Sequence, residues 1–199
     1  MLRRALLVFT AAAICSTPLW AQETRRLRAT IEKVDGSTLS VKTRDGEDLK
    51  ITLADKPLFV AIVPATLADL KPGTFVGSGA TPGPDGSLVA MEVHIFTEAM
   101  RGTGEGHRPM EGPAQATMTN ANVDTSVAAV DGQMLTLKYK DGEKKLLVTP
   151  KTAIVAYAPG DRAELKPGIK IIAVAQKQAD GSLQATRISY GRDGLTPPM

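Results

Sequence analysis

Residues 165–168 read Leu-Lys-Pro-Gly, the same four residues that stand 95 positions earlier at 70–73. Three further turn sequences recur in the same order: Val-Asp-Gly at 34–36 and 130–132, Asp-Gly-Glu at 45–47 and 141–143, and Asp-Gly-Ser-Leu at 85–88 and 180–183. A single-residue gap after Glu47 brings all four pairs into alignment. A repeat of this length with turn residues in register indicates one supersecondary unit built twice.

Each repeat has the pattern of a meander of short strands. In the first repeat, polar and apolar side chains alternate on both sides of two Asp-Gly turns, which supply the positive φ angles of tight hairpins. A short apolar run and about one helical turn, ended by Pro72-Gly73, separate these strands from two more. The expected strands of the first repeat are 29–34, 38–43, 49–53, 74–78 and 88–96, and the short apolar run is 59–63. Three strands, a helical connector and two strands follow the order of the OB barrel.

We therefore predict an all-β protein with two tandem OB-like barrels of five to six strands each, derived from an internal duplication after a cleaved signal peptide. The predicted divisions are a signal peptide at 1–21, a first barrel at 24–96, a Gly- and Met-rich linker loop at 97–124, a second barrel at 125–192 and a flexible tail at 193–199. The alternative is that strands pair across the repeats into one larger barrel or sandwich.

The first residues have the pattern of a secretory signal. A basic start at Arg3-Arg4 is followed by an apolar run too short to span a bilayer and by Ala21, where we expect cleavage. Cleavage removes Cys15, the sole cysteine, so the mature chain has no thiol for a disulfide or a thiolate ligand. We expect a periplasmic protein with no transmembrane segment after cleavage.

The charge balance argues against a nucleic-acid partner. Loss of Arg3 and Arg4 leaves 22 basic and 21 acidic side chains in the mature chain. A nucleic-acid binder needs a basic excess and, for single strands, exposed stacking rings, and neither is indicated here. The expected partner is an envelope protein or a small ligand, and the sequence identifies no cofactor.

The linker at 97–124 has no counterpart in the second repeat, and it is where we place function. One hypothesis is a metal site in which the ligands are His107, Met100, Met110 and Met118, supported by His94 at the end of the preceding strand. Imidazole and thioether groups suit a soft ion such as Cu(I). The spacing fits no compact ligand motif, so these methionines are also read as packing residues.

Two other readings of the linker concern charge. Glycines at 102, 104 and 106 present backbone amides between Arg101 and Arg108, as in anion-binding nests, although the segment lacks the Lys-Ser/Thr ending of a P-loop. Glu105 and His107, two residues apart in an extended loop, could share one face as an acid–base pair. The ligand-loop residues of these readings are Arg101, Glu105 and Arg108.

The repeated motifs, together with Met100-Arg101-Gly102-Thr103-Gly104 and the residues that follow to Asn120, resemble a group of exported proteobacterial proteins with tandem uncharacterised small β-barrel domains. Members are often labelled metal ABC transporter permease. A permease needs several membrane-spanning helices and this sequence has none, so the resemblance implies the barrel fold and adds little to the metal reading. It carries over no site residues.

The sequence favours a noncatalytic periplasmic binding or scaffold protein that presents its central loop to a ligand, with a soft metal ion as one candidate. A structural or stress-related cell-envelope protein without a small ligand is the alternative. A hydrolase-type enzyme that uses Glu105 and His107 is the third hypothesis.

Overall fold

The computed structural model describes residues 23–83 and 85–198, and these residues form an all-β protein, as predicted. Its strands are β1 (Thr24–Asp35), β2 (Thr38–Thr43), β3 (Asp48–Pro64), β4 (Phe75–Pro82), β5 (Leu88–Ile95), β6 (Gly106–Pro109), β7 (Thr117–Ala129), β8 (Gly132–Tyr139), β9 (Gly142–Val148), β10 (Ala153–Pro159), β11 (Lys170–Lys177) and β12 (Leu183–Gly191). Four 3-10 turns join them: η1 (Leu67–Asp69), η2 (Glu98–Met100), η3 (Arg162–Glu164) and η4 (Arg192–Gly194). No helix within 23–83 or 85–198 is long and apolar enough to cross a bilayer. The predicted signal peptide at 1–21 lies outside the described residues.

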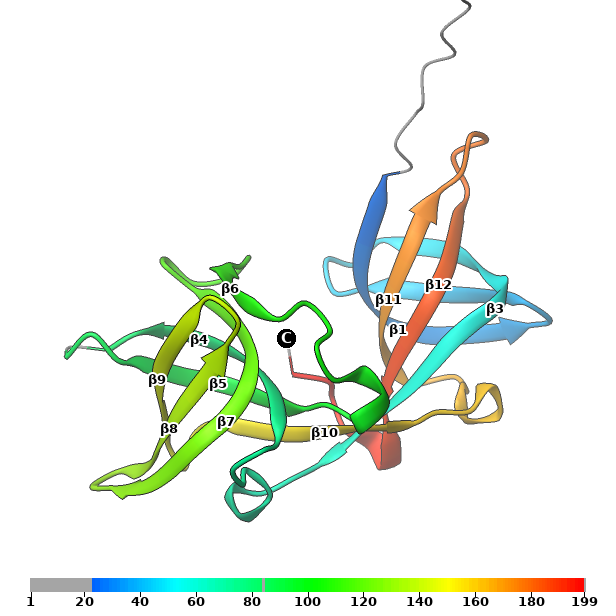
Figure 1. Ribbon diagram of the computed structural model, residues 1–199. Coiled ribbons are helices and arrows are strands. Elements are labelled where there is room, and N and C mark those ends of the chain that lie inside the picture. Colours follow the sequence, from blue (N-terminus) through cyan, green and yellow to red (C-terminus); the bar gives the residue numbers. More distant parts are fainter. Residues whose placement is uncertain (1–22, 84, 199) are drawn as a thin grey trace, which may run out of the picture.

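The first barrel is a closed circuit of β1, β2, β3, β12 and β11 (Figure 1). β1 pairs antiparallel with β2 and with β11, whereas β12 closes the circuit by pairing in parallel with β3. The second barrel repeats this plan with β7, β8, β9, β5 and β4, and β5 closes it by pairing in parallel with β9. Both circuits have the five-stranded Greek-key plan of an OB barrel.

The two repeats exchange their last hairpins. The first barrel takes β1–β3 from the first repeat and β11–β12 from the second, while the second barrel takes β7–β9 from the second repeat and β4–β5 from the first. The prediction that 24–96 and 125–192 each close a barrel is therefore wrong, because neither range contains all the strands of one circuit. Strands do pair across the repeats, yet they form two small barrels and not one large one.

The cause of the exchange is the stretch between the third strand and the helical connector. The apolar run at 59–63 continues β3 to Pro64 and carries the chain out of the first barrel, and β10 carries it back. These two crossovers pair antiparallel, with Ile62 opposite Tyr157. Gly160 allows this approach, because a Cβ there would lie 2.8 Å from the backbone carbon of Phe59. Because β3 and β10 stay extended and paired with each other, each repeat delivers its last hairpin to the barrel that holds the other repeat's first three strands.

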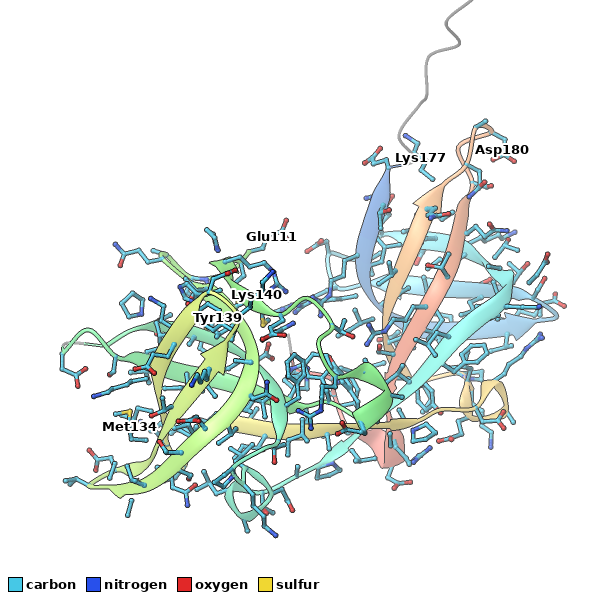
Figure 2. The ribbon with its side chains drawn as sticks, in the orientation of Figure 1. Glu111, Met134, Tyr139, Lys140, Lys177 and Asp180 are labelled. Carbon is cyan, nitrogen blue, oxygen red and sulfur yellow. The ribbon has the colours of Figure 1, made fainter. Side chains whose placement is uncertain are left out.

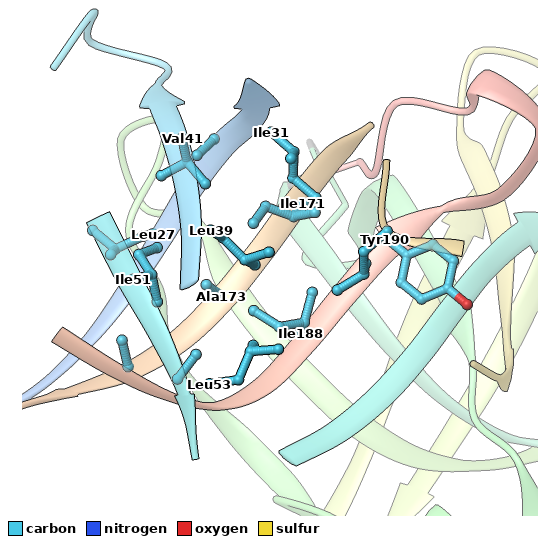
Figure 3. Close-up of a cluster of buried hydrophobic side chains, with 14 of the residues drawn as sticks. Leu27, Ile31, Leu39, Val41, Ile51, Leu53, Ile171, Ala173, Ile188 and Tyr190 are labelled. Carbon is cyan, nitrogen blue, oxygen red and sulfur yellow. The ribbon is translucent and has the colours of Figure 1, made fainter. Parts of the chain in front are cut away.

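Each barrel is filled by side chains from both repeats. Figure 3 shows Leu39, Ile51 and Leu53 from the first repeat packed with Ile171 and Ile188 from the second. The second core places Val93 of the first repeat against Leu135 and Leu146 of the second, each with no exposed surface. Burying one such side chain contributes about 1.5–3 kcal/mol, so the two repeats are stabilised jointly.

The predicted linker loop at 97–124 contains regular structure. Residues 117–124 begin β7, and β6 pairs with it, with His107 opposite Thr119. Residues 98–100 form η2. Alternating polar and small apolar residues at 117–124 explain the strand, since Ala121 and Val123 enter the second core. The segment 97–116 that remains, with β6 inside it, is called the central segment below.

The predicted flexible tail at 193–199 is held in place as far as residue 198. Residues 193–194 belong to η4, and Thr196 accepts a hydrogen bond of 2.8 Å from Lys170 Nζ. The described end of the chain therefore lies between the barrels, as Figure 1 shows.

Candidate functional site

A cleft of about 220 Å³ lies between the two barrels, beside the paired crossovers. One wall is the outer face of β1, β11 and β12 in the first barrel, and the other is the outer face of β4, β5 and β7 in the second. The central segment contributes a third side through Thr103, Gly104 and Arg108. Three parts of the chain that are far apart in sequence thus meet at one polar hollow, which we call the cleft.

A buried polar chain lies on the wall of the second barrel. His94 is 5% exposed, and its Nδ1 lies 2.7 Å from the hydroxyl of Tyr157 on β10. Its Nε2 lies 3.2 Å from Glu92 Oε2, out of hydrogen-bond alignment, and Glu92 is only 1% exposed. Burial raises the pKa of Tyr157, so its phenol is neutral in the physiological range. Because both ring nitrogens of His94 face protein groups, the ring is fixed in orientation.

Basic side chains gather on the other two sides of the cleft, the first barrel and the central segment. Arg187 of β12 stacks over the ring of Tyr157, with its guanidinium carbon 5.6 Å from the ring centroid. Its Nε is buried and has no hydrogen-bond partner. Arg26 of β1 and Arg108 of the central segment also line the cleft. Three guanidinium groups, from three parts of the chain, therefore line one small hollow.

The floor of the cleft depends on Gly77. A Cβ at this position would lie 2.7 Å from Asn120 Oδ1 and 2.9 Å from the ring of Phe96. The Phe96 ring packs edge-on against Tyr157 at 5.2 Å between centroids and against Phe75 at 5.3 Å. Asn120 donates from Nδ2 to the carbonyl of Thr103 at 2.9 Å, which leaves its buried Oδ1 without a partner.

This arrangement suits a small ligand with an anionic group. Guanidinium groups bind carboxylate or phosphate through strong charge-assisted hydrogen bonds. The buried Arg187 Nε is a donor without a hydrogen-bond partner, and a buried donor of this kind calls for an acceptor. A ligand in the cleft would supply one.

The structure divides the residues of the predicted metal site. His94 and Met118 face the cleft, whereas His107 is half-buried and bonds through Nδ1 to Thr119 Oγ1 at 2.8 Å, on the face of β7 opposite to Met118. Met100 lies in η2, and the backbone of Met110 bonds to Ala116. Within the described ranges, no three His, Cys, Asp or Glu side chains gather closely enough to hold a metal ion. The set His107, Met100, Met110, Met118 and His94 is thus split by the sheet.

The predicted ligand-loop residues also separate. Arg108 lines the cleft and donates to the carbonyl of Gly104 at 2.8 Å. Arg101 is instead bound to Glu98, Asn122 and the carbonyl of Gly73. Glu105 accepts a hydrogen bond from the backbone of Lys140 at 3.1 Å, at the end of β8 where Figure 2 labels Lys140. Of the three, only Arg108 belongs to the cleft.

Glu105 and His107 do not act together in this geometry. Glu105 is held by the β8–β9 turn, while His107 bonds to Thr119 of β7. Burial lowers the pKa of His107, and the charge of Lys144 acts in the same direction. The two side chains therefore have separate, structural partners.

Sequence reasoning missed Arg187, Tyr157, Asn120 and Arg26, because the exchanged hairpins bring them together. A signal was available in the alignment of the two repeats. β5 and β12 match at apolar positions such as Leu88 and Leu183, but Glu92 aligns with Arg187 and His94 with Ser189. Outward positions that change polarity between two otherwise similar strands mark the surface where the repeats have diverged.

Comparison of the chain with protein-family models, with curated proteins and with solved structures finds no match.

Proposed function

We propose that the chain is a noncatalytic binding protein, exported to the periplasm, whose cleft holds a small ligand with an anionic group. The observation that carries the proposal is the meeting of Arg26, Arg108 and Arg187 at one cleft of about 220 Å³. The arginines come from β1, the central segment and β12, so the site depends on the complete fold. The pattern of residues 1–21 supports export.

The contacts of His94 favour binding over catalysis, because both of its ring nitrogens face protein groups. His94 faces Tyr157 with one ring nitrogen and Glu92 with the other. A general acid or base needs a ring nitrogen within reach of the reacting proton. Here the imidazole serves to orient Tyr157, whose ring supports Arg187.

The test is an NMR titration of the full chain with inorganic phosphate and, separately, with acetate. We expect saturable shifts of the Gly77, Gly104 and Asn120 amides. Arg187→Gln should weaken binding roughly ten- to a hundredfold, because one charge-assisted hydrogen bond is lost. Arg25→Gln is the matched control, since Arg25 neighbours Arg26 on β1 and does not line the cleft.

Two results would count against the proposal. If neither anion shifts the cleft amides, a structural envelope protein without a small ligand becomes the better account. If Arg25→Gln weakens binding as much as Arg187→Gln, the anions are attracted by overall charge and not by the cleft.

A further inference from the structure

A second hollow, of about 400 Å³, lies on the outer face of the first barrel. It is lined by β1 at 28–30, by β11 at 170–172, by Arg44, and by Thr196 and Pro197 of the C-terminal segment. Among the described residues that line it, Arg28, Arg44 and Lys170 are charged and none is acidic. We call it the tail cavity.

The C-terminal wall of this cavity is fixed by several contacts. The chain folds back at Gly191, where a Cβ would lie 1.7 Å from the carbonyl oxygen of Leu195. Arg192 forms a double hydrogen bond with Glu164, at 2.8 and 2.7 Å, and donates to the carbonyl of Pro159. Lys170 then bonds to Thr196 at 2.8 Å. The tail is thus anchored at both ends of η4, and the cavity is a built feature.

Two of the three cations of the tail cavity, Arg28 and Arg44, lie close enough to affect each other. Burial lowers the pKa of Arg28, and the charges of Arg26 and Arg44 act in the same direction. Glu92 and Glu111 oppose this effect, but neither lines the cavity. An anion placed in the cavity would relieve the repulsion between Arg28 and Arg44.

The tail cavity adjoins the cleft. Ile172 lines both, and the alternation of side chains along β1 places Arg26 in the cleft and Arg28 in the cavity. Two residues along a strand span about 7 Å, so the cationic positions follow one another along the outer face of the barrel.

We propose that the tail cavity is a second anion subsite, and that the ligand is an elongated molecule with at least two anionic groups, one held in the cleft and one in the cavity. This inference rests on the proposed function for the cleft and adds the class of ligand. Phosphate and carboxylate groups share the required chemistry, so the probes must separate them.

The test compares a short-chain linear polyphosphate with an oligogalacturonate by calorimetry, and follows inorganic phosphate by NMR, all on the full chain. In Arg44→Gln/Lys170→Gln, affinity for the preferred elongated probe should fall about tenfold, as expected when two exposed ion pairs are lost. Phosphate shifts of the Gly77 and Asn120 amides should persist in that variant. Thr196→Ala, which keeps the cations and frees the tail, should have a smaller effect, and Arg25→Gln should have almost none.

The outcomes distinguish the two proposals. Equal losses in Arg44→Gln/Lys170→Gln and Arg25→Gln would overturn the second subsite and leave the cleft intact. Binding that Arg187→Gln leaves unchanged but Arg44→Gln/Lys170→Gln abolishes would overturn the proposed function and leave an anion site in the cavity alone. A wild-type chain that binds neither elongated probe contradicts the inference whatever phosphate does.

Discussion

The two barrels share one plan, yet their facing surfaces differ. At equivalent positions the first barrel presents Arg187 and Ser189 where the second presents Glu92 and His94. At the centre of the crossover pair, Tyr157 lies opposite Ile62. The inward positions, by contrast, remain alike, as with Leu39 and Leu135, both fully buried. The inward positions, which every barrel needs, are therefore alike in the two barrels, whereas the surfaces between the barrels differ and form a polar site.

The largest expected effect comes from cutting the chain between the repeats. A protease site inserted between Gly112 and Pro113, in an exposed part of the central segment, would yield two pieces that share both barrels. We expect the cut pieces to elute together at the mass of the intact chain and to separate only in denaturant. Each piece alone lacks the strands that close its three-stranded portion. Two folded particles that separate in buffer would show that each repeat forms its own barrel.

The next effect compares the cores. Leu39→Ala and Leu135→Ala remove equivalent side chains with no exposed surface, and each should lower the free energy of unfolding by about 2–5 kcal/mol. Because each barrel holds strands of both repeats, we expect a single transition by circular dichroism in both variants. Val130→Ala, at a fully exposed position, should change stability by less than about 0.5 kcal/mol. Two separate transitions would mean that the barrels unfold independently.

The third prediction concerns the difference between the two crossovers, which place Tyr157 of β10 opposite Ile62 of β3. Tyr157→Phe deprives the buried His94 of its hydroxyl partner and should cost about 1–3 kcal/mol. Tyr157→Ile, which places the residue of position 62 at both sites, also removes ring contacts with His94 and Phe96 and should cost about 2–4 kcal/mol. Chemical denaturation measures both, with Tyr139→Phe as control. If the Phe variant equals wild type, the bond to His94 contributes nothing to stability.

The sequence was sufficient for the parts of the fold that depend on local pattern. Asp-Gly turns and alternating strands predicted the hairpins, and the predicted helical connector is present as η1, where Asp69 Oδ2 accepts a hydrogen bond from the Thr66 amide at 2.8 Å. The composition of each barrel could not be predicted, because both closing hairpins fit either barrel: Ala90 and Ala185 occupy the same inward position. The choice depends on the pairing of β3 with β10, which is a contact distant in sequence.

The site was predicted only in part for the same reason. His94, Arg108 and Met118 were identified as candidates from the chemistry of their side chains, and all three line the cleft. Arg187 and Tyr157 stand in strands with ordinary alternation, and only the exchanged topology brings them to His94. Local pattern therefore identified residues of β5, β7 and the central segment, and long-range pairing supplied Arg187 and Tyr157.

The smallest effect concerns a feature of the second barrel alone, the added strand β6. His107 of β6 is a poorer base in the folded state than in the unfolded chain, because burial lowers its pKa. The unfolded state therefore binds more protons between the lowered pKa and the usual value of about 6.5, so stability rises with pH in this window. Above about pH 7.5, the free energies of unfolding of wild type and of His107→Gln, measured by thermal unfolding, should differ by a constant amount.

As pH falls through about 6.5, wild type should lose stability relative to the variant, and the difference in free energy of unfolding should level off below the pKa of His107 in the folded state. The histidine proton signals of the wild type should place that pKa below 6.5 directly. A wild type that gains stability relative to His107→Gln on acidification would instead mean that Thr119 and its surroundings favour the imidazolium.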